Sequence, residues 1–385
     1  MTATRSHPRL RVSRFAGTVL VVAAVLVGCS GDRSATAGRD GDYAEVSSAG
    51  DTATAAAIRR VGAYRCPEAA DRAGGAAVPL SAGRKLQVAT TVAPITSIVG
   101  NVAGDRAEVR GVIPEGTDSH TYEPKPSVAE LFGTADVVFA NGLALEEQTV
   151  ELAEQNVPPG ARVVELGSVA LRPDQYIYDF SFPRDGGRPN PHLWTNPPMA
   201  RCYALIVGDV LATADPANAA FYRTNAEAFG AKVDDLDRRF QAASDSMDPR
   251  NRALLTYHDA YAYFAAHYRW RVIGAIQVSS FDDPTPRDVV DLIGQVEAEG
   301  VPAIFGSEVF PSPVLAQIGK EAGVTYVDEL RDDDLPGAPG ESGHSYLGLM
   351  KTDFVTMVSS LDGDPSGLAA FDPADVAPDR AEYPQ

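Results

Sequence analysis

A long helical pattern between residues 215 and 246 divides the sequence into two segments. Over this stretch the apolar residues recur mostly at intervals of three and four, which predicts one amphipathic helix. Asp215 and Pro216 suit the start of such a helix, as a capping residue and as a first helical residue. A helix of about 30 residues spans about 45 Å, which is longer than one small lobe. The pattern therefore favours two lobes joined by a rigid helical connector.

Each of the two segments alternates between short apolar stretches and amphipathic ones. In the first segment we expect strands at residues 86–91, 107–113, 135–140 and 162–166. In the second segment we expect strands at residues 253–257, 272–276, 303–306 and 324–327. Because helical patterns lie between these strands, both segments should form parallel βα units. The predicted fold class is α/β, with two (β/α) lobes that contain parallel sheets and are joined by one long rigid helix.

These patterns also predict the organisation of the chain. We expect an N-terminal α/β lobe at residues 85–214, a connecting helix at 215–247 and a C-terminal α/β lobe at 248–361. Residues 29–84 are rich in small and polar residues without a lasting apolar period, so they are predicted to be a flexible tether. The Asp- and Pro-rich residues 362–385 are predicted to be a loose tail.

The first 28 residues have the pattern of an export signal. Four arginines precede an apolar run from Phe15 to Val27, which is too short to span a bilayer. Small residues before Cys29 resemble the lipobox of bacterial lipoproteins, which implies a lipoprotein signal peptide at residues 1–28 and a lipid on Cys29. The chain is therefore expected to be extracytoplasmic and lipid-anchored to the bacterial cell membrane.

The charge of the chain argues against one class of partner. The full chain carries a net charge of −19, and without residues 1–28, which contain four arginines and no acidic residue, it would carry −23. Such a surface argues against nucleic-acid binding. It could draw cations towards a site, or it could simply keep the protein soluble.

Two cysteines remain once Cys29 is assigned to lipidation. Cys66 and Cys202 would form one even pair outside the cytoplasm, where a disulfide is plausible and would attach the N-terminal extension to the first lobe. Two free cysteines are the alternative. No CxxC spacing occurs, which argues against a zinc site made of thiolates.

Three histidines and one aspartate stand at similar distances along the chain. His120, His192, His258 and Asp328 are separated by 72, 66 and 70 residues. His258 and Asp328 each follow a predicted strand, and His120 lies shortly after one. Ligands of open α/β sheets bind at the carboxyl ends of the strands, so two facing lobes would bring these residues into one cleft. Three imidazoles and a carboxylate suit a divalent transition metal.

The sequences around these four residues resemble a known family. The stretches Gly116–Pro124, Asn190–Pro197, Tyr257–Phe264 and Tyr326–Asp328 are similar to the metal-binding motifs of bacterial zinc/manganese-binding proteins of ABC transporters, the cluster A-I solute-binding proteins. The likeness extends from about Lys85 to Leu361.

The resemblance implies both a site and a function. The metal ligands would be His120, His192, His258 and Asp328, in a cleft between the lobes. The protein would capture a metal outside the membrane and deliver it to an ABC permease, with a metallochaperone as a further possible partner. We expect a monomer that is not an enzyme.

The identity of the metal is less clear from the sequence. Zinc-specific members often carry a histidine-rich loop before the second motif, but residues 172–189 contain no histidine. Manganese-type members tend to carry a carboxylate where this chain has His258. Because imidazole ligands favour Zn²⁺ over the harder Mn²⁺, we expect Zn²⁺, with Mn²⁺ or Fe²⁺ as the alternative.

Two other classes of protein compete with this interpretation. A zinc hydrolase could use Glu308 or Glu123 as a base, but the sequence has no H-E-x-x-H or G-x-S-x-G motif, and four protein ligands leave no obvious place for a reacting water. A surface protein with a role in cell adhesion could hold a metal only structurally.

Glu308 has a second possible role besides that of a base, because it could orient a ligand from outside the metal's coordination sphere. His344 lies in an acidic loop that could collect cations or could simply be flexible.

Overall fold

The computed structural model describes residues 52–384, except residues 73, 81–82, 278–283 and 308–311. The predicted signal peptide at residues 1–28, the lipidation site Cys29 and the candidate residue Glu308 lie outside the described residues.

The first sheet contains four parallel strands in the order β2-β1-β3-β4. Its strands are β1 (Leu86–Thr90), β2 (Ala107–Gly111), β3 (Val137–Ala140) and β4 (Arg162–Glu165). The helices between and after them are α3 (Ala93–Ala103), α4 (Pro126–Phe132), α5 (Glu147–Asn156) and α6 (Leu166–Ala170). Every side chain of β3 is buried, as expected for a parallel sheet covered on both faces.

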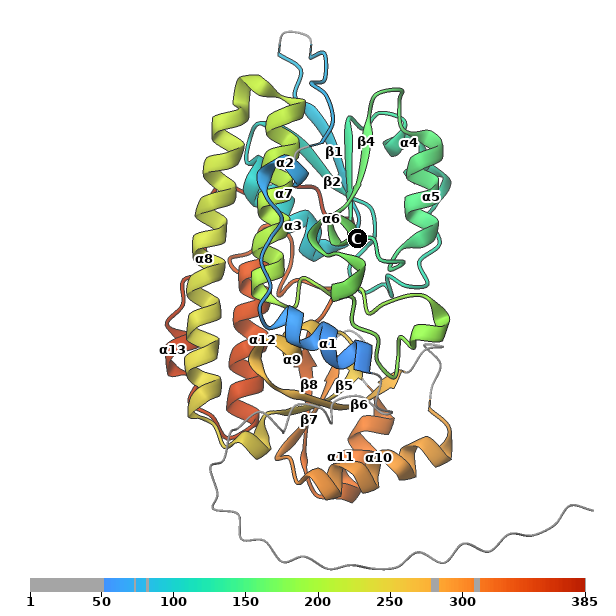
Figure 1. The fold of residues 1–385 in the computed structure, drawn as a ribbon, viewed down its shortest axis with the longest axis vertical. Helices are drawn as coiled ribbons and strands as arrows, with labels where there is room; N and C mark the ends of the chain where they lie inside the picture. Colours follow the sequence, from blue (N-terminus) through green and yellow to red (C-terminus); the bar gives the residue numbers. More distant parts are fainter. Residues whose placement is uncertain (1–51, 73, 81–82, 278–283, 308–311, 385) are drawn as a thin grey trace, which may run out of the picture. The chain divides into compact units, whose positions relative to one another are not determined.

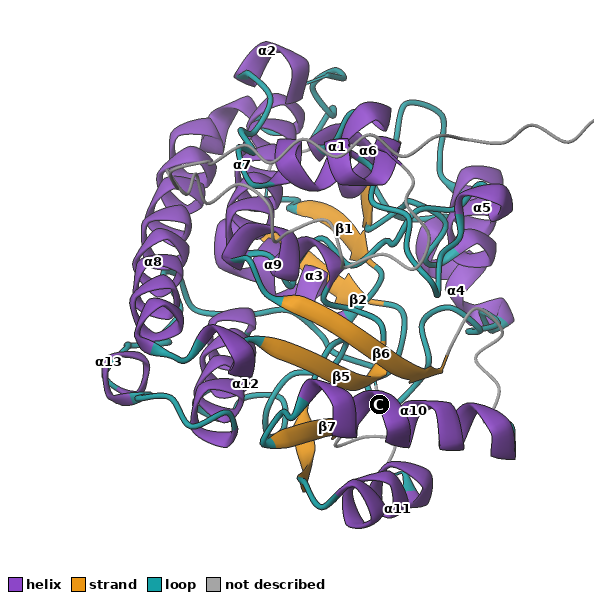
Figure 2. Ribbon diagram, turned by 60° about the horizontal axis from the view of Figure 1, so that its bottom comes forward, coloured by secondary structure: helices purple, strands orange, loops and turns teal. Residues whose placement is uncertain are grey.

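The second sheet repeats this arrangement in the order β6-β5-β7-β8. Its strands are β5 (Ala253–His258), β6 (Arg271–Gln277), β7 (Ala303–Ser307) and β8 (Thr325–Leu330). The accompanying helices are α9 (Ala262–Tyr268), α10 (Pro286–Glu299), α11 (Pro313–Ala322) and α12 (Tyr346–Ser360). Figure 2 shows α10 and α11 together on one side of this sheet. Each predicted strand is present, with ends that differ by a few residues at most.

Two long helices connect the sheets. Helix α7 (Pro197–Ala214) is followed by a short 3-10 turn and then by α8 (Ala219–Ser246), whose 28 residues span about 42 Å. Figure 1 shows α8 beside both α7 and α12. Asn225 of α8 donates a hydrogen bond to the Val102 carbonyl of α3, and the ring of Phe240 lies 4.2 Å from that of Phe354 of α12. Because α8 packs against helices associated with both sheets, it forms the rigid connector that the sequence predicts.

The C-terminal residues do not form a loose tail. Leu368 of α13 (Ser366–Ala369) and Phe371, which follows this helix, are buried in the hydrophobic core. Glu382 then exchanges backbone hydrogen bonds with Val109 and Gly111, and so extends the first sheet beyond β2. The prediction of a loose tail at residues 362–385 is wrong because a few apolar side chains and the free edge of β2 order an otherwise polar segment.

The N-terminal extension is also ordered where the structure describes it. Helices α1 (Thr52–Val61) and α2 (Ala69–Arg72) precede β1, and Ala57 and Val61 are buried in the core. A disulfide joins Cys66 to Cys202 of α7. The predicted tether at residues 29–84 is therefore wrong for residues 52–80. Among the described residues, none of the helices combines the length and hydropathy needed to cross a membrane.

Candidate metal centre

The first of the predicted ligands, His120, lies in the loop that follows β2. The Asp118 carboxylate accepts a hydrogen bond from the His120 backbone N–H at 2.9 Å. A short aspartate side chain that binds the backbone two residues later stabilises a tight turn. This turn directs the His120 ring towards the two other histidines, with ring centroids 5.1 Å apart in both pairs.

His192 is fully buried in the loop before α7, and Asn190 sets the position of its ring. The Asn190 side-chain oxygen accepts hydrogen bonds from the His192 backbone N–H at 3.1 Å and from ring Nδ1 at 2.9 Å. The Asn190 amide nitrogen in turn donates to Asp179 and to the Asp259 carbonyl. Because Nδ1 carries the donated proton, Nε2 of neutral His192 has a free lone pair.

His258 is the last residue of β5, at the carboxyl edge of the second sheet. Its Nδ1 contacts Oδ2 of Asp332, in a loop held in place by a hydrogen bond from Trp194 Nε1 to the Asp332 carbonyl. Burial lowers the pKa of His258, but the charge of Asp332 and the hydrogen bond to it outweigh burial and raise this pKa to about 9. The metal-free protein therefore holds a proton on His258 at neutral pH.

The three imidazoles converge through their Nε2 atoms. His120 Nε2 lies 3.1 Å from His192 Nε2 and 3.2 Å from His258 Nε2, and the ligand nitrogens of all three lie within 4.8 Å of one another. Two nitrogens bound at about 2.0–2.1 Å to one tetrahedral ion would lie about 3.3–3.4 Å apart. Three ring nitrogens around one point are thus arranged closely enough to share a single cation.

Burial keeps two of these rings neutral. It holds the pKa values of His120 and His192 well below the ordinary value of 6.5, and the neighbouring His258 lowers both further. A neutral imidazole is the form that binds a metal, so these two residues need not lose a proton first.

Asp328 does not join this group. The sequence predicts that β8 ends at Val327, but the strand continues to Leu330, and the side chain of Asp328 is exposed along it. The carboxyl edge of the sheet therefore falls at residues 331–334. Among the described residues, the group whose ligand atoms converge contains the three histidines and does not include Asp328.

Two acidic residues that the sequence analysis did not select, Asp332 and Asp333, lie close to His258 instead. Both are half-buried, and the Ser119 hydroxyl, next to His120, donates a hydrogen bond to Asp333 Oδ2. Asp333 Oδ1 is buried without a hydrogen-bond partner in the described part of the chain. Burial raises the pKa of Asp333 well above its ordinary value, and the charge of Asp332 raises it further. The signal in the sequence for these residues was the run of three aspartates that begins two residues after the end of the strand.

His344 lies apart from the three converging imidazoles. It is buried, with Nε2 3.6 Å from Oε2 of Glu115 and its ring 4.8 Å from that of Tyr383. The structure thus places His344 inside the protein and not in an exposed, flexible acidic loop.

With the geometry established, the chain can be compared with known proteins. Residues 88–360 match the family described as ZnuA, the periplasmic component A of zinc-uptake complexes. The chain belongs to this family. Like other members of the ZnuA family, it is a metal-binding, substrate-binding component of an ABC transporter and not an enzyme.

Curated relatives in this family carry the names of different metals. The manganese-binding lipoprotein MntA of Halalkalibacterium halodurans is 26% identical over 279 residues, which cover 72% of this chain and 89% of MntA. The manganese ABC transporter substrate-binding lipoprotein PsaA of Streptococcus pneumoniae is 25% identical, over 70% of this chain and 87% of PsaA. The iron-binding protein YfeA of Yersinia pestis is 27% identical, over 68% of this chain and 82% of YfeA.

Solved structures show the same fold. The periplasmic zinc-binding protein TroA of Treponema pallidum superposes with a TM-score of 0.66 at 25% identity, covering 72% of this chain and 99% of TroA. A manganese-bound periplasmic metal-binding protein of Candidatus Liberibacter asiaticus superposes with a TM-score of 0.64 at 24% identity, covering 72% of this chain and all of that one.

Proposed function

We propose that this ZnuA-family protein captures Zn²⁺ outside the cytoplasm and delivers it to an ABC permease for import. The observation that carries this proposal is the convergence of the three Nε2 atoms of His120, His192 and His258. Their spacing is close to that of nitrogens on one tetrahedral zinc ion.

We further propose that Asp333, and not Asp328, supplies the fourth ligand. Asp333 is half-buried beside Ser119, has a buried Oδ1 without a hydrogen-bond partner in the described part of the chain, and is close enough for its charge to raise the pKa of His258. Asp332 already contacts Nδ1 of His258, so its role is to hold that ring with Nε2 directed at the metal.

The donor set favours zinc over manganese. Three imidazoles and one carboxylate suit Zn²⁺, whereas Mn²⁺ prefers a larger number of oxygen ligands. TroA, described as a zinc-binding protein, supports this choice, whereas MntA and PsaA, named for manganese, and YfeA, named for iron, make Mn²⁺ and Fe²⁺ the alternatives.

The cellular location that we propose is based on the N-terminal sequence. We propose that Cys29 becomes the lipidated first residue of a monomeric protein anchored to the outer face of the cytoplasmic membrane. The relatives MntA and PsaA are named as lipoproteins. Anchoring keeps the metal-loaded protein close to a membrane permease, and a metallochaperone could load it.

A competition titration tests the choice of metal. Purified protein is stripped of metal, its metal content is checked by elemental analysis, and Zn²⁺ and Mn²⁺ are titrated against a chelator of known affinity. We expect one tightly bound Zn²⁺ per chain and at least tenfold weaker binding of Mn²⁺. Tighter binding of Mn²⁺ would refute the assignment of zinc, and stoichiometric binding of neither metal would refute the function.

A further inference from the structure

Residues 52–80, of which residue 73 is not described, form a strap along helices on both sides of the metal centre. This strap contains α1 and α2 and comes before the family match, which begins at residue 88. The strap is therefore an addition of this chain to the region that matches the family. Its two ends contact α7 and α9, the helices that follow two of the histidines.

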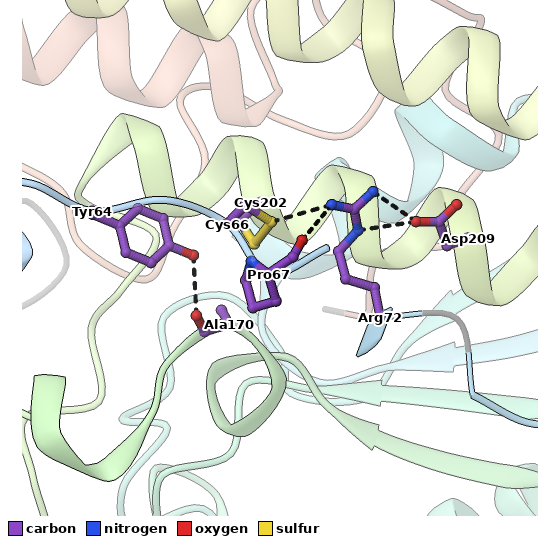
Figure 3. The surroundings of a disulfide bond; sticks show 7 residues. All are labelled: Tyr64, Cys66, Pro67, Arg72, Ala170, Cys202 and Asp209. Carbon is purple, nitrogen blue, oxygen red and sulfur yellow. Dashed lines mark hydrogen bonds and ion pairs between the residues drawn. A yellow bond between two sulfur atoms is a disulfide. The ribbon is translucent and has the colours of Figure 1, made fainter. Parts of the chain in front are cut away.

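One end of the strap is covalently attached to α7. Cys66 and Cys202 form a disulfide with Cα atoms 5.3 Å apart, as Figure 3 shows. Close by, Arg72 forms an ion pair at 2.8 Å with Asp209 of the same helix, and both side chains are largely buried. Helix α7 begins at Pro197, five residues after His192, and the intervening residues are all buried.

The other end of the strap packs against α9. Ala57 and Val61 of α1 are buried in the core, and α1 lies against α9. Helix α9 begins at Ala262, four residues after His258. The position of α1 is thus linked to that of His258 through a short, buried stretch of chain.

Between these ends the strap crosses the short segment that follows β4. The Tyr64 hydroxyl donates a hydrogen bond to the Ala170 carbonyl at 3.2 Å, and the Arg60 guanidinium donates to the Asp174 carbonyl at 2.7 Å. The strap is therefore held at several points along its length and is not attached only by its disulfide.

We infer that this disulfide-anchored strap limits the separation of α7 and α9, and with it the separation of His192 and His258, so that bound metal is released more slowly. This inference rests on the proposed capture of metal by the three histidines. Release requires the imidazoles to move apart, and a link that restricts the open arrangement raises the free energy of that arrangement. A disulfide is suited to this role because it persists in an oxidising compartment.

A purely stabilising role would have a different signature. If the strap only added to the stability of the fold, its release would lower the melting temperature without changing the metal dissociation rate of the folded protein. The dissociation rate is therefore the quantity to measure.

The test uses the full chain with a protease recognition sequence inserted between Ala76 and Ala77, which are both exposed. After cleavage, only the disulfide and non-covalent contacts hold the strap, and a reductant then removes the covalent link. Zinc dissociation into excess chelator is followed by stopped flow in four states, which are uncut or cut, each oxidised or reduced. Near-UV circular dichroism monitors the fold.

We expect the cut and reduced state to release Zn²⁺ at least about fivefold faster than the other three, which is the lower end of typical coupling between sites. Equal rates in all four folded states would overturn the inference. If the cut and reduced protein unfolds, the dissociation rate is measured instead on the intact chain with Val61→Ala. This substitution weakens only the contact of α1 with the core. Val61→Ala should also raise the rate, and an unchanged rate would equally overturn the inference.

Arg59→Gln is the matched control on the same strap. Arg59 is exposed on α1 and takes part in none of the contacts described above, so this variant should keep the rate of the unmodified protein. Failure of the uncut protein to bind zinc would refute the proposed function instead. In that case hydrogen exchange of α9 decides the strap inference: faster exchange after cutting and reduction supports it, and unchanged exchange overturns it.

Discussion

Replacement of Asp332 by asparagine should change how metal affinity depends on pH. In the metal-free protein, contact with Asp332 raises the pKa of His258 to about 9 in spite of burial. His258 is therefore protonated at neutral pH and must lose a proton when it binds a metal. Asparagine has nearly the same shape but no charge, so in Asp332→Asn burial should keep the pKa of His258 below 6.5.

The size of the effect follows from the pKa. At pH 7.5 a group with a pKa of about 9 is neutral in only about 3% of molecules, so proton competition weakens the apparent affinity about 30-fold. Between pH 6.5 and 8.5 the affinity of the unmodified protein should rise about tenfold per pH unit, because the raised pKa lies above this window. In Asp332→Asn the affinity should be nearly constant from pH 7 to 8.5.

The same substitution should weaken binding at high pH. Loss of a partner that orients a ligand typically costs about 10- to 100-fold in metal affinity. At pH 9, where proton competition has largely disappeared, Asp332→Asn should therefore bind zinc more weakly by about that factor, and the difference should shrink as pH falls.

Two measurements check this reasoning. Chelator competition at a series of pH values gives the slope, and calorimetry in two buffers with different ionisation enthalpies counts the protons released. We expect Asp332→Asn to release about one proton fewer per zinc at pH 7.5 than the unmodified protein. Equal pH slopes in the two proteins would refute the assignment of the proton to the His258–Asp332 pair.

Three further predictions concern the ligands and the C-terminal segment. His258→Ala should lose at least about 100-fold in zinc affinity, and His344→Ala should change it far less, because only His258 lies among the converging nitrogens; comparable losses in competition titrations would contradict this assignment. Asp333→Asn should weaken zinc binding at least tenfold, whereas Asp328→Asn, on the exposed face of β8, should bind zinc normally, and the reverse order would restore Asp328 as the ligand. Phe371→Ala should lower the free energy of unfolding by about 3–5 kcal/mol because it leaves a cavity in the core. If denaturant unfolding shows no change, the C-terminal segment is not packed against the core in solution.

The sequence predicted the two sheets and the three histidines that the structure brings close together. Strands such as β3 and β5 were found from their apolar runs, because a strand buried on both faces leaves a local pattern in the sequence. The connecting helix was found because its helical periodicity continues over 28 residues, which is longer than most helices in globular proteins. His258 was correctly placed at the end of β5, and parallel sheets bring such ends together at one edge.

Other features depended on contacts between residues far apart in the sequence. The end of β8 was misplaced by three residues because pairing with β7, and not local pattern, extends this strand to Leu330. That shift places Asp328 within the strand and Asp332, which contacts His258, just beyond its end. Sequence patterns locate the boundaries of an element less well than its presence.

The order of the two terminal segments also depends on contacts between residues far apart in the sequence. Their composition is that of flexible chain, and composition predicts order only when a segment can bury enough of its own apolar surface. Val61 and Phe371 are instead buried against parts of the protein distant in sequence, and Cys66 lies 136 residues from the cysteine that it joins. Local sequence determined which elements form and which side chains can bind a metal. Only the tertiary structure decided which carboxylate contacts His258 and which terminal segments are ordered, because both depend on distances that no local pattern records.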